Sequence, residues 1–369
     1  MWRASPALHA KNTSLYLLLI LASFPVSGQE SEARPWEKIK LPEEAAARNL
    51  NSVFFLDANL GWIVGEKGLC LLTLDGGHTW AAAATGSTAT LRDVRFKDAQ
   101  NGWACGDGDE KAFPSKKGHL VMSRPLLSGT LLGTTDGGKT WTVSWVPTNF
   151  VINCVEISAA PILQVGISGG GTHLDGDITR TDYNEKNWTV RRCYRALFDI
   201  AAITESAWVA VGSPVSVGFI PRPSEATYTN KDCRALLSKD GGKSWNVSKG
   251  SNGNGCLRSI AIGKGSLLLA AGDQGAILYS QNSGADWKAA KSGTTENLNG
   301  IACHQERAVA LAVGMKGTVI VGTGECTEWK ELQALPVNLN GVSVAGDSLI
   351  AVGDKGAVFI ARIEKLVSK

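Results

Sequence analysis

The stretch "LLTLDGGHTW" (Leu71–Trp80) decides the fold because it recurs along the chain. Related stretches are "GTTDGGKTW" (Gly133–Trp141) and "LSKDGGKSW" (Leu237–Trp245). In each, an Asp can accept hydrogen bonds from the N–H groups of a turn, and two glycines can adopt positive φ. The Ser or Thr can add a local hydrogen bond, and the Trp can pack against the flanking strands. We therefore predict structural roles for six residues, which are Asp75, Trp80, Asp136, Trp141, Asp240 and Trp245.

The spacing of these Trp residues indicates a repeated unit. Units with altered turns end at Trp188, Trp287 and Trp329, and the shortest spacing is about 42 residues, which is in the range of propeller blades. The earlier half of a unit, such as "LAVGMKGTVIVG" (Leu311–Gly322), reads as strand, Gly turn and strand. A preceding strand such as "LNGIAC" (Leu298–Cys303) brings the number of strands per unit to four, which is the propeller pattern.

The two ends of the chain complement each other. The last unit, "GVSVAGDSLIAVGDKGAVFIARIEK" (Gly341–Lys365), has three strands but no Trp strand, whereas "PWEKIKL" (Pro35–Leu41) is a Trp strand without the other three. We therefore predict an all-β fold, a seven-bladed β-propeller of four-stranded blades, with the ring closed by the N-terminal strand. This single domain is expected to occupy residues 29–369. Closure would leave no wide unpaired sheet edge.

Residues 1–28 read as a signal peptide. Arg3 and Lys11 precede the apolar run "LYLLLILASF" (Leu15–Phe24), and small residues follow it. The run is short for a membrane span. We expect the protein to be exported, whether secreted, periplasmic or lumenal, after cleavage of this segment.

The chain has eight cysteines. An even number in an exported protein favours disulfides, and the pairs closest in sequence are Cys233–Cys256 and Cys303–Cys326. The alternative for Cys70, inside "GLCLLT", is a small buried hydrophobic residue. No CxxC or Cys/His spacing indicates zinc, so we expect no metal and no cofactor.

The repeats resemble the Asp-box (BNR) repeat and, more closely, the propeller family of the photosystem II assembly factor Ycf48. The stretches that carry this resemblance are "VFFLDANLGWIVGEKG" (Val53–Gly68), "VRFKDAQNGWACGDG" (Val94–Gly108) and the "TTDGGKTW" turn. The resemblance covers residues from about Trp36 to Ile363. It implies a seven-bladed propeller, exported or lumenal, that binds protein partners without catalysis and has no catalytic residue. Long insertions in the second to fourth units depart from the compact pattern.

These insertions suggest a binding surface. They are Asp107–Gly129, Gly169–Arg180 and Ser213–Arg234, and each lies between the second and third strands of its unit, where propeller loops share one face. Long loops of compact domains are often functional, and guanidinium groups suit carboxylate partners. We predict that this face docks an acidic segment of a protein partner, such as a membrane complex, through a basic rim. The rim residues are Lys116, Lys117, Arg124, Arg180, Arg191, Arg192, Arg195, Arg222 and Arg234.

Other functions remain open from the sequence. Sialidases also carry Asp boxes on a propeller, but the Arg-Ile-Pro motif is replaced here by "ARPWEKI" (Ala33–Ile39), and no Glu stands out as a partner for Tyr194. A glycan-binding surface could use Phe113, Phe219 and Tyr228. The formal charge of +3 gives no reason to expect nucleic-acid binding. We expect a monomer; "NWT" and "NVS" are sequons whose use depends on the host.

Overall fold

The structure is a computed structural model that describes residues 35–109, 129–144, 151–158, 162–168, 176–182, 189–192, 196–214 and 234–367. Pro35–Lys369 forms one compact unit. The expected signal peptide lies outside the described residues. Of the segments expected as insertions, only the ends are described.

Within the described residues, the strands form seven four-stranded antiparallel sheets, and we call each sheet a blade. Blade 1 is β2 (Leu50–Phe55), β3 (Gly61–Gly65), β4 (Leu69–Thr73) and β5 (Ala81–Ala84). Blade 2 is β6 (Leu91–Phe96), β7 (Gly102–Gly106), β8 (Thr130–Thr134) and β9 (Thr142–Ser144). Blade 3 is β10 (Val151–Ile157), β11 (Ile162–Ser168), β12 (Gly176–Asp182) and β13 (Thr189–Arg192). Blade 4 is β14 (Leu197–Ala202), β15 (Trp208–Gly212), β16 (Ala235–Ser238) and β17 (Asn246–Val247).

Blade 5 is β18 (Leu257–Ile262), β19 (Leu268–Gly272), β20 (Ile277–Ser280) and β21 (Lys288–Ala289). Blade 6 is β22 (Leu298–His304), β23 (Val309–Gly314), β24 (Val319–Thr323) and β25 (Trp329–Glu331). Blade 7 is β26 (Leu339–Ala345), β27 (Ser348–Gly353), β28 (Ala357–Arg362) and β1 (Trp36–Ile39). The helix α1 (Ile363–Val367) follows β28. The all-β propeller of four-stranded blades is therefore confirmed.

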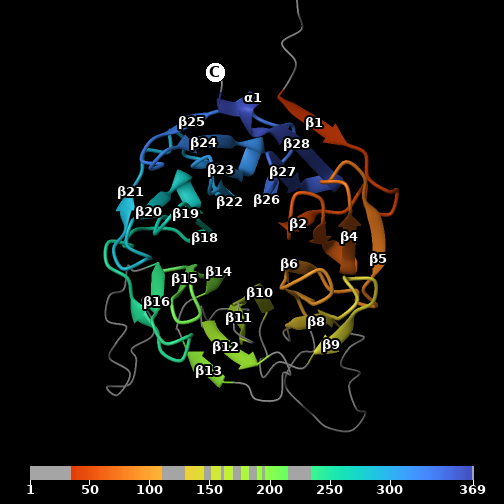
Figure 1. Ribbon diagram of the computed structural model, residues 1–369, viewed down its shortest axis with the longest axis horizontal. Helices are drawn as coiled ribbons and strands as arrows, with labels where there is room; N and C mark the ends of the chain where they lie inside the picture. Colours follow the sequence, from red (N-terminus) through yellow and green to blue (C-terminus); the bar gives the residue numbers. More distant parts are fainter. Residues whose placement is uncertain are drawn as a thin grey trace, which may run out of the picture. The chain divides into compact units, whose positions relative to one another are not determined.

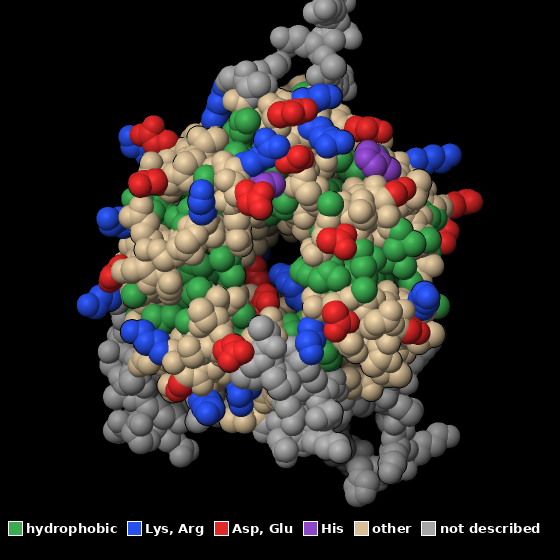
Figure 2. Space-filling view, viewed as in Figure 1, with side chains coloured by type: hydrophobic (Ala, Val, Ile, Leu, Met, Phe, Trp, Pro, Cys, Tyr) green, Lys and Arg blue, Asp and Glu red, His purple; other side chains and the backbone are tan. Residues whose placement is uncertain are grey.

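The blades are arranged as a ring (Figure 1), and the space-filling view shows a central channel as a hollow in its middle (Figure 2). The first strand of each blade lies innermost, and consecutive inner strands β2, β6, β10, β14, β18, β22 and β26 contact one another, with β26 contacting β2 again. Strand β1 completes blade 7 by pairing antiparallel with β28, in a register that places Trp36 opposite Ala361. The predicted closure by the N-terminal strand is confirmed. Pairing β1 with β28 satisfies backbone groups that would otherwise stay open.

Blades pack on one another through their second strands. The strands "GWIVG" (β3), "GWACG" (β7) and "WVAVG" (β15) are buried along their whole length. Their side chains alternate between the two neighbouring blades, as strand geometry requires. Ile63 of β3 packs toward blade 7, and Trp62 packs toward blade 2, where its ring stacks on Phe96 at 3.5 Å between centroids. This burial supplies the main driving force of the fold.

The Gly-Gly turns join the third and fourth strands of their blades. In blade 1, the N–H and the hydroxyl of Thr79 both donate to the Asp75 carboxylate, at 2.9 and 2.6 Å. Gly76 and Gly77 have φ of 71° and 92°, and the Trp80 Nε1 donates to the Gly77 carbonyl at 2.8 Å. The hydrogen bonds predicted from the sequence are therefore present around Asp75. The turns at Asp136 and Asp240 repeat the arrangement, with Trp141 and Trp245 donating in the same way.

The cysteines do not follow the expected pairing. Cys303 and Cys326 are free thiols, so the proposed disulfide between them is wrong; Cys256 is also free, and Cys233 lies outside the described residues. Both Cys303 and Cys326 belong to the apolar contact between blades 5 and 6. Burial raises the pKa of Cys303 to about 12, which keeps the thiol protonated and unreactive. Cys70 is fully buried, as the alternative for it predicted.

Among the described residues, no helix has both the length and the apolar character that a membrane crossing requires.

Candidate functional site

The inner strands carry the same irregularity in every described blade. Each has a β-bulge next to its first Leu or Ile, which leaves the following residue without a partner in the ladder. A bulge re-aims side chains, and all the bulge residues line the central cavity, whose volume is about 120 Å³. They are Asn51, Arg92, Asn153, Phe198, Arg258, Asn299 and Asn340.

Four of these bulge residues are Asn, and each binds the next blade; we call this set the amide ladder. The Nδ2 of Asn299 donates to the Leu339 carbonyl at 2.9 Å, and that of Asn340 donates to the Leu50 carbonyl at 3.0 Å. Asn51 reaches the Leu91 carbonyl at 2.7 Å, and Asn153 makes the corresponding contact with Leu197 at 2.6 Å. Each Asn thus gives a hydrogen-bond donor to a backbone carbonyl at the start of the next inner strand.

The two bulge arginines bind within their own blades instead. Arg92 pairs with Asp107, and Arg258 pairs with Asp273, both at 2.5 Å from Nε to the carboxylate. These pairs neutralise the arginines at the mouth of the channel.

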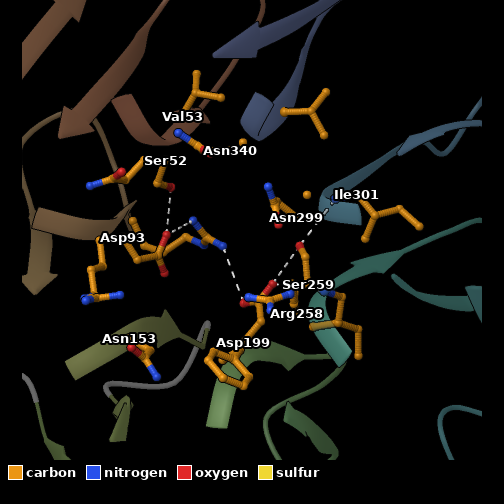
Figure 3. A pocket seen from close by; sticks show the side chains of 18 residues that line it. Ser52, Val53, Asp93, Asn153, Asp199, Arg258, Ser259, Asn299, Ile301 and Asn340 are labelled. Carbon is orange, nitrogen blue, oxygen red and sulfur yellow. Dashed lines mark hydrogen bonds and ion pairs between the residues drawn. The ribbon is translucent and has the colours of Figure 1, made fainter. Parts of the chain in front are cut away.

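Four ionisable residues from three blades form a charged cluster across the channel, namely Asp93, Arg95, Glu156 and Asp199. The Arg95 guanidinium lies 2.7 Å from Asp93, 3.5 Å from Glu156 and 3.9 Å from Asp199. Asp93 also accepts a hydrogen bond from the Ser52 hydroxyl at 2.9 Å, and Asp199 accepts one from the Ser259 hydroxyl at 3.0 Å. Figure 3 shows most of these contacts as a chain that runs from Ser52 through side chains of four blades to the backbone N–H of Ile301 in blade 6.

Burial controls the protonation of the charged cluster. Burial raises the pKa of Glu156 to about 7, although the charge of Arg95 acts against this increase. Burial also raises the pKa of Asp199 to about 6. The Arg95 pKa is lowered by burial but raised by its three carboxylate neighbours, and the net shift is upward. With three carboxylates around one guanidinium, the cluster has an excess of negative charge that a proton on Glu156 relieves.

The carboxylates of the charged cluster are engaged by other groups of the protein. Each carboxylate contacts Arg95, and backbone N–H groups of Val155 and Ile260 bind Asp93 and Asp199 at 3.1 and 2.9 Å. A glycosidase needs two carboxylates on opposite sides of a scissile bond. Acidic and basic side chains do meet at the hollow in the middle of the ring (Figure 2). The three carboxylates of the charged cluster, however, all contact the same guanidinium, that of Arg95.

The face that carries the insertions is formed by two kinds of loop. Loops that join the second and third strands of a blade contact the loops that lead to the next blade, as the hydrogen bonds from Gly68 N–H to Ala89 O (2.6 Å) and from Leu335 N–H to Gly317 O (2.9 Å) show. We call this side the loop face. The described ends of the insertions, at Asp109 and Gly129 and at Pro214 and Arg234, lie at the same strand ends.

The structure places only part of the predicted basic rim. Arg234 is 5% exposed, and its guanidinium donates to the carbonyls of Ser251, Asn252 and Asn254 at 3.0 to 3.3 Å. It therefore holds the loop that leads from β17 of blade 4 to β18 of blade 5. Arg180 lies near the end of β12 that is away from the loop face. Its Nε donates at 2.9 Å to the Gly241 carbonyl in a Gly-Gly turn. The predicted position of Arg180 on the loop face is therefore wrong.

Arg191 and Arg192 belong to the outermost strand of blade 3, β13. Their side chains are not described. The other rim residues lie outside the described residues, namely Lys116, Lys117, Arg124, Arg195 and Arg222.

Sequence reasoning missed both the amide ladder and the charged cluster. A signal was present, because "LN" or "IN" opens the inner strand at Leu50, Ile152, Leu298 and Leu339. The charged cluster had no such signal, since Arg95 and Asp199 are distant in sequence and only the ring brings them together.

The fold of the described part defines a class of repeat protein, the β-propeller with four-stranded blades. The family model of the photosynthesis system II assembly factor YCF48 matches residues 28–235, more than half of the chain. The chain belongs to the YCF48 family. No curated protein sequence matches it.

Several solved structures share the fold. "YCF48 bound to D1 peptide" is 19% identical, with a TM-score of 0.61, and the match covers 89% of this chain and 95% of the other. YCF48 from Cyanidioschyzon merolae is 16% identical, with a TM-score of 0.62 and coverage of 89% and 99%. The GH74 xyloglucanase from Xanthomonas campestris is 12% identical, with a TM-score of 0.64, and the match covers 89% of this chain and 54% of the enzyme.

Proposed function

We propose that this protein is an exported, non-catalytic assembly factor that binds a segment of a partner protein. The observation that carries the proposal is its membership of the YCF48 family, together with the solved complex of a YCF48 protein with a D1 peptide. The charged cluster supports a non-catalytic role, because its carboxylates are engaged with Arg95 and with backbone groups.

The binding site that we propose is the loop face, and its partner is an acidic segment. In blades 1, 5, 6 and 7, the second and third strands are joined by short turns such as Glu66–Gly68 and Asp354–Gly356. In blades 2 and 4 the corresponding connections are much longer and contain Lys116, Lys117 and Arg222. Basic side chains on one face favour encounter with an acidic segment, with a dependence on ionic strength. A monomer suffices for this function.

Charge reversal tests the proposal. A fluorescent D1 peptide is titrated with the wild-type protein and with the variants K116E/K117E and R191E/R192E, and anisotropy gives the Kd. We expect a loss of affinity of at least about tenfold, because each reversal replaces attraction by repulsion. The matched control is K139E/K243E, which makes the same charge change in two Gly-Gly turns on the other face. Equal affinities for all four proteins would refute the loop-face site.

A glycoside hydrolase is the second candidate, favoured by the similarity to the GH74 xyloglucanase fold. Release of reducing sugar from xyloglucan or a sialoside by the purified protein would support it. Loss of that activity in E156Q would place the reaction in the channel. We expect no turnover, because Glu156 and its neighbours hold Arg95 and leave no free opposed pair.

A further inference from the structure

The seam between blades 1 and 2 exposes apolar side chains at the perimeter of the ring. Leu74 is 71% exposed and Val143 is 50% exposed, and these are two of the four large hydrophobic residues that are exposed in the described part of the chain. Val143 pairs with Leu132 across the strands, and Leu132 belongs to the apolar cluster between the two blades. Leu72, Ala83 and Trp141 pack on the same cluster and are only half-buried, with Leu74 directly after the strand of Leu72.

The outermost strand of blade 1 borders this seam. Strand β5 consists of four alanines, Ala81–Ala84, and three of them are exposed. It pairs with β4 on one side and with no described strand on the other, so a row of backbone N–H and C=O groups is open. The outer strands β1, β21 and β25 carry charges that discourage pairing, namely Glu37, Lys38, Lys288, Lys330 and Glu331.

The seam between blades 5 and 6 shows how the same position is closed elsewhere. There the Lys291 N–H donates to the Thr327 carbonyl, and the Trp329 N–H donates to the Lys291 carbonyl, both at 2.9 Å. A salt bridge of 2.9 Å from Lys291 to Glu328 covers this parallel bridge. The seam between blades 4 and 5 has a corresponding bridge between Lys249 and Asp286. Ala84 occupies the matching position in blade 1, four residues after the Trp, and no bridge joins it to blade 2 among the described residues.

Figure 2 shows hydrophobic side chains gathered over the blade of β2 to β5, on the right of the view, in a band that charged side chains border. A contiguous exposed apolar patch on a protein marks an interaction site.

We propose that this seam binds an extended, uncharged segment of a partner protein, which adds to β5 as a fifth strand of blade 1. The open edge selects an extended backbone, because only a strand can satisfy its row of donors and acceptors. Alternate side chains of that strand point to one side, where Leu74 and Val143 favour apolar groups. The absence of charge along Ala81–Ala84 favours an uncharged segment, in contrast with the acidic segment proposed for the loop face. The inference rests on the proposed function only in that the occupant is a protein.

The test uses an uncharged hexapeptide with alternating Ser and Val, and hydrogen–deuterium exchange of the full chain. We expect the peptide to slow exchange in fragments that cover Ala81–Ala84 by at least about threefold. The variant A81K/A84K introduces the lysines that occupy matching positions at Lys288 and Lys291, and it should abolish this protection. The matched control, A289K, adds a lysine to the exposed edge of β21 and should leave it intact. A second variant, L74Q/V143Q, removes only exposed apolar groups and should weaken the protection. It provides the test if A81K/A84K fails to fold.

Three outcomes overturn the inference. The first is the absence of protection in the wild-type protein, and the second is protection that survives both seam variants. The third is a concentration-dependent dimer of the protein alone that A81K/A84K abolishes, because the occupant would then be a second copy. The experiment is separate from the D1 peptide titration. If the loop-face variants bind the D1 peptide as well as the wild type does, the result for β5 is unaffected. If no peptide protects β5, the result for the loop face is unaffected.

Discussion

The two sides of the channel join their blades by different physical means. On one side, three members of the amide ladder, Asn299, Asn340 and Asn51, link blades 6, 7, 1 and 2 through neutral hydrogen bonds, while the fourth, Asn153, links blades 3 and 4 beside the charged cluster. On the other side, the charged cluster links blades 2, 3 and 4 around Arg95. Neutral amides satisfy local carbonyls at little desolvation cost, whereas buried ions depend on one another. The comparison teaches that the inner strands of neighbouring blades can be joined in two ways. One way uses hydrogen bonds that act independently, and the other uses ionic contacts that depend on one another.

The largest expected effect is from removing the centre of the charged cluster. R95M leaves three buried carboxylates without their shared cation, and we expect the free energy of unfolding to fall by about 3 kcal/mol. Urea denaturation at pH 7 measures this loss. R307M serves as the control, because Arg307 pairs with Asp347 at an exposed site and should change the stability by less than about 1 kcal/mol. Equal effects for the two variants would contradict the cooperative role of Arg95.

The second expected effect is a pH dependence confined to the charged cluster. The pKa of Glu156 is raised from its ordinary value to about 7 in the folded state, so the folded state binds the proton more tightly. Its contribution to stability is full below about pH 4.5 and is lost as the pH rises through 7. Urea denaturation should show a loss of about 2 kcal/mol between pH 5 and pH 8. E156Q should reduce this loss and leave the smaller part that comes from Asp199, whose pKa is also raised, to about 6; an unchanged slope would show that Glu156 does not carry the effect.

The smallest expected effect is from the amide ladder. N299A leaves the Leu339 carbonyl without its side-chain donor, and we expect a loss of about 1 kcal/mol because only one neutral hydrogen bond is removed. N246A, at an exposed position of β17, is the matched control and should be neutral. The N299A effect should not vary between pH 5 and pH 8. A pH-dependent loss would mean that the two sides of the channel are coupled.

The sequence predicts those features that are local. The Asp75 turn and the Gly-bounded second strands follow from short-range chemistry, and the complementary ends predicted the pairing of β1 with β28. The position of Arg180 required knowledge of strand direction: β12 runs away from the loop face, so a residue near its end lies on the other side. The charged cluster could not be predicted, since the contact of Arg95 with Asp199 depends on the curvature of the whole ring.

The pairing of Trp36 with Ala361 joins the first strand of the ring to the last one made. Synthesis at the usual rate separates the appearance of these two residues by tens of seconds. Throughout that interval the apolar groups of Trp36 and Ile39, which end up buried, have no binding strand. The ring can therefore close only after β28 has been made, and until then the strand that closes it is an unpaired apolar segment at risk of aggregation.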